Sequence, residues 1–221
     1  TDLRSQLNKV NFVRSRQETG SYCGPAVMQM LLSAIGLEMK QEDLVNAYAS
    51  KEVVMREGIP LVRMSGALKK IHPELVVWQK DKTTIEELKI LVDSGYAVAV
   101  DWQGIFNSDE YGDEYWNFQS KWKEKWKQWR GVPTLKGDQG HYCIALEVNL
   151  EKGYLRFADP YGHYAGKDRY VALWEFEERW WDDRIDTDEK GKKVYVLEER
   201  LVFIVTSKED QKPGEMGMTV I

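Results

Sequence analysis

Two cysteines and three histidines are the side chains in this sequence best suited to nucleophilic catalysis. The cysteines are Cys23 and Cys143, and the histidines are His72, His141 and His163. A cysteine attacks a carbonyl carbon as its thiolate, and a neighbouring histidine usually serves as the base. The first question is therefore which cysteine and which histidine could form such a pair.

Cys23 stands at the start of a predicted helix. Residues 23–35 read CGPAVMQMLLSAI, which is apolar on nearly every face, with Pro25 in the first turn and Gly36 after the end. The unpaired N–H groups and the positive end of the dipole at a helix N-terminus favour a thiolate. This position favours Cys23 as a nucleophile, and the alternative is a structural thiol packed as a small hydrophobe.

His141 is the best candidate base. It begins the predicted strand HYCIALEV directly after a glycine-bounded turn, which is a rigid mount at the edge of a sheet. His72 precedes a proline in a polar loop, and His163 lies in the turn PYGHYAG. The alternative for His141 is an ordinary hydrogen-bonded histidine at a strand edge.

Asp159 is the candidate for the group that orients this base. It ends the predicted strand YLRFADP, where Pro160 turns the backbone out of the sheet. If the strands 141–148 and 154–160 form a hairpin through a turn at 151–153, Asp159 comes near His141. The alternative is that an Asp before a proline simply forms a turn.

Cleavage of an amide also requires donors for the developing oxyanion. The side-chain amide of Gln17 lies six residues before Cys23, whose own N–H is a second donor. The alternative for Gln17 is a solvated loop residue. Cys143 falls two residues after His141 on the same strand face, so it is interpreted as a core thiol, with a redox partnership to Cys23 as the weaker alternative.

These motifs together resemble the papain-like cysteine peptidases of the C39 type. The motifs are Gln17, YCGPA at 22–26, Gly-His-Tyr at 140–142 and Ala-Asp-Pro at 158–160. The resemblance implies that Gln17 helps to form the oxyanion hole, Cys23 attacks, His141 is the base and Asp159 orients it. The best-known members are fused to membrane transporters and cut leader peptides after paired glycines; no transporter segment is present here, so that substrate class is not carried over.

The expected fold is α+β and papain-like, with a helical first half that carries the nucleophile on a buried central helix against a small antiparallel sheet. We expect one domain over residues 1–221, with an insertion at about 103–139. Helices are expected at 23–35, 41–49, 61–71, 85–93 and 172–181, and strands at 96–102, 141–148, 154–160 and, as a pair, within 194–206.

The insertion carries aromatic residues at helical spacing, with basic residues on the other faces. The aromatic residues are Tyr111, Tyr115, Phe118, Trp122, Trp126 and Trp129, and the basic ones are Lys121, Lys123, Lys125, Lys127 and Arg130. The favoured interpretation is an aromatic face packed beside the cleft. A substrate-binding lid and association with a membrane surface or a partner through 111–130 are the alternatives.

Charge and composition narrow the class of protein. The net charge is −5, the two cysteines form no CxxC pattern, and no stretch approaches a membrane span. We expect no nucleic-acid partner, no metal and no organic cofactor, a peptide or protein substrate, and a cytoplasmic location. The acidic run Asp182, Asp183, Asp186, Asp188 and Glu189 is interpreted as a solvated turn before a final hairpin. An acyl transferase on the same machinery and a non-catalytic peptide-binding module remain alternatives to a peptidase.

Overall fold

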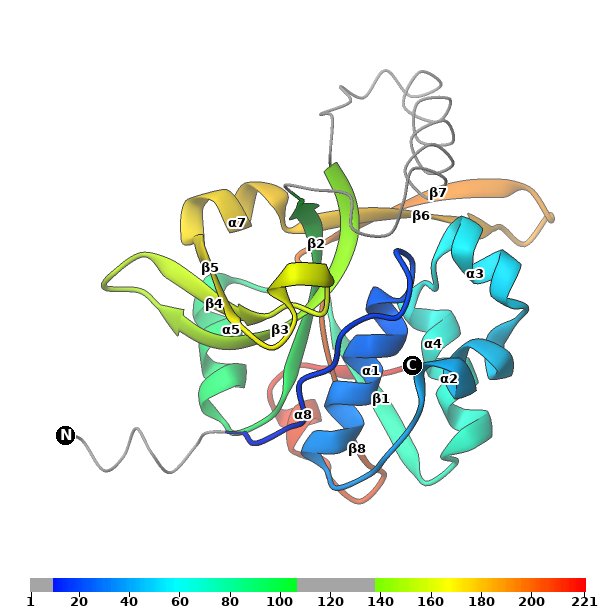
Figure 1. Cartoon of the computed structure of the whole chain (residues 1–221), viewed down its shortest axis with the longest axis horizontal. Helices are drawn as coiled ribbons and strands as arrows, with labels where there is room; N and C mark the ends of the chain where they lie inside the picture. Colours follow the sequence, from blue (N-terminus) through cyan, green and yellow to red (C-terminus); the bar gives the residue numbers. More distant parts are fainter. Residues whose placement is uncertain (1–9, 107–137) are drawn as a thin grey trace.

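The sheet at the centre of the fold is seven-stranded and antiparallel (Figure 1). The structure, a computed structural model, describes residues 10–106 and 138–221, so the predicted aromatic helix at 111–130 lies outside it. In spatial order the strands are β5 (Asp168–Ala172), β4 (Tyr154–Ala158), β3 (Asp138–Asn149), β2 (Val98–Ile105), β8 (Val202–Ser207), β1 (Leu75–Lys80) and β9 (Thr219–Val220). A separate hairpin pairs β6 (Trp181–Thr187) with β7 (Lys193–Glu199).

Helices cover both faces of this sheet. One face carries α1 (Cys23–Ala34), α2 (Gln41–Tyr48), α3 (Lys51–Glu57) and α4 (Leu61–Ile71), and the other carries α5 (Ile85–Asp93) and α7 (Leu173–Arg179). Two shorter elements are η2 (Gly162–Tyr164) and α8 (Lys212–Glu215). In Figure 1, α1 crosses the middle of the sheet, and the β6–β7 hairpin runs over the ends of β2 and β3 toward the side of α3.

Strand β2 shows how the two faces are built. Ala99 packs into the core under α1, whereas Val98, Val100 and Trp102 pack into the core under α5 and α7. Because successive side chains of a strand point to opposite faces, a strand with two covered faces is apolar at nearly every position. Asp101 is an exception in β2, because it is a buried carboxyl group in a strand that is covered on both faces.

Helix α1 begins where the sequence predicts, and a glycine lets it lie close to its neighbours. A Cβ atom on Gly24 would stand 2.6 Å from the sulfur of Met64 and 3.5 Å from the ring of Tyr142. The first helical hydrogen bond runs from the N–H of Ala26 to the carbonyl of Tyr22. The Cys-Gly-Pro sequence thus brings the start of α1 against both α4 and β3.

The α+β, papain-like fold is confirmed, and the sheet is larger than expected. The helices expected at 41–49, 61–71 and 85–93 and the hairpin of β3 with β4 are present. The expected pairing within 194–206 is wrong, because β7 pairs with β6 while β8 pairs with β1 and β2. Asp182, Asp183 and Asp186 accordingly belong to strand β6 rather than to a solvated turn.

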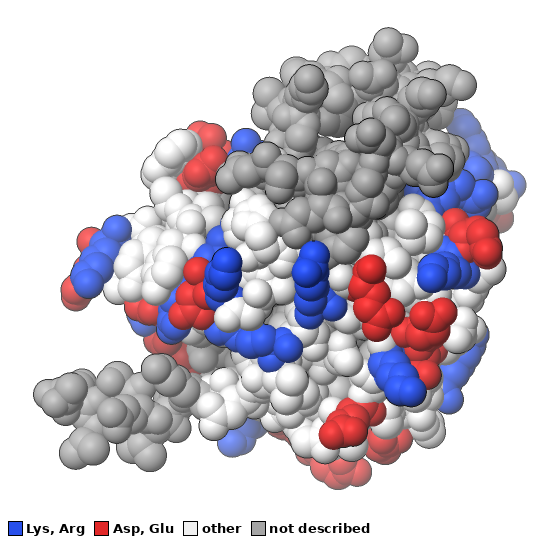
Figure 2. All heavy atoms as spheres, viewed as in Figure 1, with Lys and Arg blue, Asp and Glu red and all other residues white. Residues whose placement is uncertain are grey.

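Both ends of the segment 103–139, which was expected to be an insertion, belong to the central sheet. Residues 103–105 continue β2 and residues 138–140 begin β3, which pair with each other. None of the helices described is long and apolar enough to cross a membrane. On the face shown in Figure 2, acidic and basic side chains are interspersed.

Candidate active site

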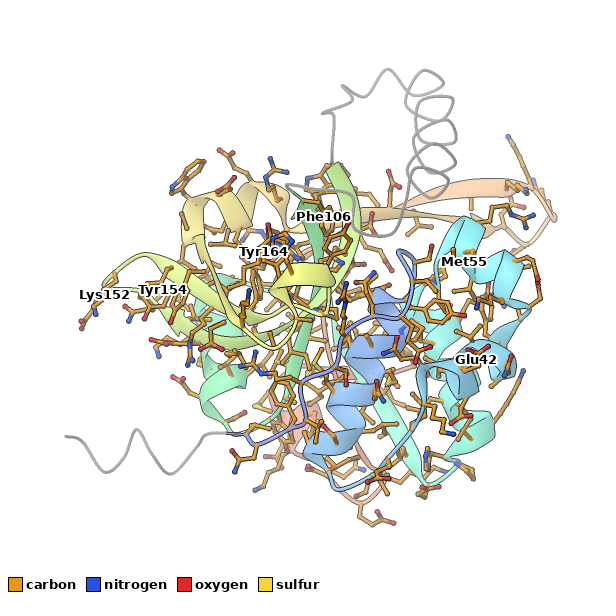
Figure 3. All side chains as sticks on the ribbon, in the orientation of Figure 1. Glu42, Met55, Phe106, Lys152, Tyr154 and Tyr164 are labelled. Carbon is orange, nitrogen blue, oxygen red and sulfur yellow. The ribbon has the colours of Figure 1, made fainter. Side chains whose placement is uncertain are left out.

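His141 and Asp159 form a buried hydrogen-bonded pair. The Nε2 atom of His141 lies 2.8 Å from Oδ1 of Asp159, and the two side chains are 2% and 0% exposed. The β3–β4 register, which pairs Ile144 with Ala158, brings the start of one strand beside the end of the other. The rings of Phe106 and Tyr161 lie against the imidazole, and Figure 3 labels Phe106 just beyond the end of β2.

The second oxygen of Asp159 is held by an arginine that the sequence analysis did not single out. Nη1 of Arg169, on β5, donates to Oδ2 of Asp159 at 2.6 Å, and the N–H of Tyr161 donates to Oδ1 at 2.8 Å. The guanidinium also stacks 3.8 Å from the centre of the Tyr164 ring. Asp159 is therefore held by three donors, which leaves it one orientation in which to receive the imidazole.

Each member of the pair stabilises the charged form of the other. Burial alone would raise the pKa of Asp159, but His141 and Arg169 hold this pKa at about 2, below its ordinary 3.8. Burial alone would lower the pKa of His141, but the Asp159 carboxylate raises it well above 6.5. An imidazolium beside a carboxylate is therefore the favoured state near neutral pH.

The free energy of unfolding is expected to depend on pH through both of these pKa shifts. The Asp159 contribution, about 2 kcal/mol, is present above pH 3.8 and is lost as the pH falls toward 2. The His141 contribution is complete below pH 6.5 and is lost as the pH rises through the raised pKa. Urea unfolding across this range should show both declines in the wild type, and His141→Gln should lack the alkaline one. Identical pH profiles for the two proteins would contradict this assignment.

Cys23 is the accessible thiol of the two. It is the first residue of α1 and half-buried, whereas Cys143 is fully buried. The N-cap residue Tyr22 makes no side-chain capping bond and the first turn holds no acidic residue, so the helix itself contributes no negative side chain at its positive end. In the part of the chain that the structure describes, no hydrogen bond joins Cys23 to His141.

Cys23 and His141 make no hydrogen bond because they lie on different faces of the sheet. Helix α1 packs on the sheet face that carries Ala99 and Tyr142, while Trp102 and Cys143, and with them His141, belong to the opposite face. The register and the two cores thus put the Cys23 and His141 side chains on opposite faces of the sheet. Catalytic hydrogen bonds are often long in an unliganded enzyme and shorten when substrate binds.

Gln17 is buried and fastens the turn before the nucleophile. Its Nε2 donates to the carbonyls of Thr19 at 2.8 Å and Gly20 at 3.0 Å, and its main-chain N–H donates to the carbonyl of Pro160 at 2.9 Å. Gln17 thus links the segment before Cys23 to the turn after Asp159. To act as an oxyanion donor, the Nε2 group would have to give up its hydrogen bond to one of these carbonyls and donate to the substrate oxygen instead.

Cys143 lies beside the His141–Asp159 pair but is not suited to attack a substrate. Burial raises the pKa of its thiol to about 11, and Nε1 of Trp102 donates to its sulfur at 3.4 Å. The potential ligand atoms of His141, Cys143 and Asp159 lie within 4.8 Å of one another. However, Arg169 already binds the Asp159 carboxylate and its positive charge opposes a cation there, so this donor set belongs to the hydrogen-bond network rather than to a metal.

Comparison with known sequences places the chain in a family. The sequence model described as "Peptidase_C39 like family" matches residues 7–184. The chain belongs to the Peptidase_C39 like family. A comparison with curated proteins finds no match.

Solved structures of C39 peptidases share the fold. The peptidase domain of Streptococcus ComA, a bifunctional ABC transporter involved in a quorum-sensing pathway, is 14% identical, with a TM-score of 0.51; the match covers 90% of this chain and 100% of that domain. A putative C39-like peptidase from Bacillus anthracis is 16% identical, with a TM-score of 0.50 and coverage of 91% and 98%. The C39-like family and this fold support an enzyme of the cysteine-peptidase type.

Proposed function

We propose that this C39-like protein is a cysteine peptidase in which Cys23 is the nucleophile, His141 the general base and acid, and Asp159 the orienting group. The observation that carries the proposal is the His141–Asp159 pair at 2.8 Å, buried and held further by Arg169 and Tyr161. Because Nε2 of His141 is bound to Asp159, Nδ1 is the ring atom that would exchange a proton with the Cys23 thiol.

The reaction follows from these roles. The Cys23 thiolate forms a bond to the carbonyl carbon of the scissile amide, and the carbonyl electron pair moves to the oxygen, which the N–H of Cys23 and the amide of Gln17 would stabilise. When the carbonyl re-forms, the carbon–nitrogen bond breaks and the His141 imidazolium gives its proton to the departing amine. Water then attacks the thioester, His141 takes a proton from it, and the carbon–sulfur bond breaks to restore the thiolate.

The two thiols are expected to differ strongly toward iodoacetamide. Cys23 should be alkylated at pH 6 at least about 100-fold faster than Cys143, because a thiol whose pKa is about 11 is ionised in roughly one molecule in 10⁵ at that pH and Cys143 is also buried. Peptide mapping of the alkylated protein at several times measures both rates.

His141→Ala is the informative variant in this experiment, since it should slow the alkylation of Cys23 by removing the imidazolium that stabilises the thiolate. His163→Ala, which changes a histidine in a turn outside the proposed machinery, is the matched control and should leave both rates unchanged. Equally slow labelling of the two thiols in the wild type would refute the assignment of Cys23 as the nucleophile.

A peptide library tests the activity itself. Incubation of internally quenched peptides with the wild type, with Cys23→Ala as the control for contaminating peptidases, should yield cleavage by the wild type alone. Addition of an amine acceptor to the same reactions separates hydrolysis from acyl transfer, because a transferase would yield the amide of the added amine.

A further inference from the structure

Asp101 is a buried carboxyl group that the reaction above does not use. It is 1% exposed, and neither of its oxygens has a hydrogen-bond partner among the residues that the structure describes. A buried carboxyl group without a partner costs several kcal/mol when charged. A ligand that supplied donors to it would recover much of this cost.

Asp101 lies on the same face of the sheet as the nucleophile. In the β2–β3 register it stands opposite Tyr142, whose ring packs into the core under α1. Its charge interacts with the thiol of Cys23, the first residue of α1. A group bound by Asp101 would therefore lie on the side of the sheet that carries α1 and Cys23.

Two further carboxylates approach Asp101 from the β6–β7 hairpin. Asp182 and Glu198 are direct cross-strand neighbours in this hairpin, and both interact electrostatically with Asp101. The Asp182 carboxylate also lies against Gly140, where a Cβ atom would be too close to it. Nε2 of Gln103, two residues after Asp101 on the same face of β2, donates to Oδ1 of Asp182 at 3.0 Å.

We propose that Asp101, with Asp182 and Glu198, forms a specificity site beside Cys23 that binds the cationic side chain of a lysine or arginine in the peptide substrate. This inference rests on the proposed peptidase function and names a substrate class for it. An ammonium or guanidinium group carries three or five N–H donors, so it can bind the two free oxygens of Asp101 and reach a second carboxylate.

The charges around Asp101 agree with a site that is completed by a cation. Burial, followed by Asp182 and Glu198, raises the pKa of Asp101 well above 3.8, and Cys23 acts in the same direction while His141 opposes it. A cation bound beside Asp101 would lower this pKa, because an opposite charge favours the carboxylate. A metal ion fits less well. Among the described residues, the group whose ligand atoms lie close enough to share a metal ion is His141, Cys143 and Asp159, and it does not include Asp101.

The experiment compares peptides that differ in one charged side chain. Internally quenched peptide sets carry lysine, arginine, glutamine or norleucine in turn at each position around the cleaved bond, and kcat/KM is measured for each. We expect the wild type to prefer lysine or arginine over norleucine at one position by about 10-fold or more, which corresponds to a hydrogen bond to a charged group. Asp101→Asn should bring this ratio close to one. Asp182→Asn should also lower the ratio, to a value between one and that of the wild type.

Asp183→Asn is the matched control. Asp183 follows Asp182 in the chain, and as its neighbour on β6 it lies on the opposite face of the hairpin, opposite Leu197. The ratio should therefore stay at the wild-type value in this variant. A wild type without any preference for basic residues, or a preference that Asp101→Asn and Asp182→Asn both leave intact, would overturn the proposal.

A second measurement keeps the test valid if no peptide is cleaved. Methanethiosulfonate reagents with a cationic or an anionic end modify Cys23 without turnover, and the ratio of their rates reports the potential beside the thiol. Asp101→Asn should lower the preference for the cationic reagent several-fold, and Asp183→Asn should not. An unchanged ratio would overturn the cation site, whereas absent cleavage with a lowered ratio would count against the peptidase function alone.

Discussion

Cys23→Ser is expected to lower kcat/KM on any peptide that the wild type cleaves by at least about 10⁴-fold, because a serine hydroxyl cannot replace a thiolate in a site built around an ion pair. The change in stability should be small. The side chain is half-buried and close in size to serine, and the structure shows no hydrogen bond from it to His141 in the described part of the chain. The measurement is the initial cleavage rate of one peptide chosen from the library, with urea unfolding as the check on folding.

Cys143→Ser is the matched control for this prediction. The hydroxyl oxygen of serine can still accept the hydrogen bond from Nε1 of Trp102, so the packing beside His141 is largely kept. This variant should retain most of the activity even if it loses some stability. The opposite pattern, with activity lost in Cys143→Ser and kept in Cys23→Ser, would rule out the proposed nucleophile.

Asp159→Asn should reduce both activity and stability. An asparagine cannot hold the imidazolium by charge and offers an N–H that competes for its orientation, so kcat is expected to fall by about 10² to 10⁴-fold. The substitution also leaves Arg169, whose side chain is 9% exposed, without its carboxylate partner. Removal of one member of a buried ion pair costs about 3 to 5 kcal/mol, which should appear in the free energy of unfolding.

Asp168→Asn is the control for this prediction. It removes a nearby carboxylate without changing the His141–Asp159 pair. Asp168 pairs with Arg14 and Arg156 at the surface, and its side chain is 34% exposed. Exposed ion pairs contribute about 1 kcal/mol or less, so this variant should keep its activity and nearly all of its stability. Cleavage rates must be compared at a temperature where circular dichroism shows both variants folded. An Asp159→Asn protein with wild-type kcat would contradict the orienting role.

Local patterns predicted a large part of the fold. The apolar run from Cys23, with its proline and closing glycine, specifies a buried helix without reference to the rest of the chain. The hairpin of β3 with β4 is similarly local, because a turn of a few residues determines which positions face each other. This is why Asp159 could be expected beside His141 from spacing alone.

Pairing between distant segments was not predictable in the same way. Strands β7 and β8 are neighbours in sequence, yet one pairs with β6 and the other with β1 and β2. Either arrangement satisfies their alternation of apolar residues, so the pattern could not decide between them. The acidic residues of β6 were misassigned for the same reason, since their place depends on the strand that pairs with them.

The types and order of the proposed catalytic residues, and the local elements that hold them, follow from the sequence because each depends on short-range patterns. The tertiary structure alone brings Arg169 onto the second oxygen of Asp159, joins the main-chain N–H of Gln17 to the carbonyl of Pro160, and gathers Asp182 and Glu198 around Asp101. These contacts join segments whose side chains carry no local signal of each other. Their energies depend on burial and charge, which exist only once the sheet and its helices have assembled.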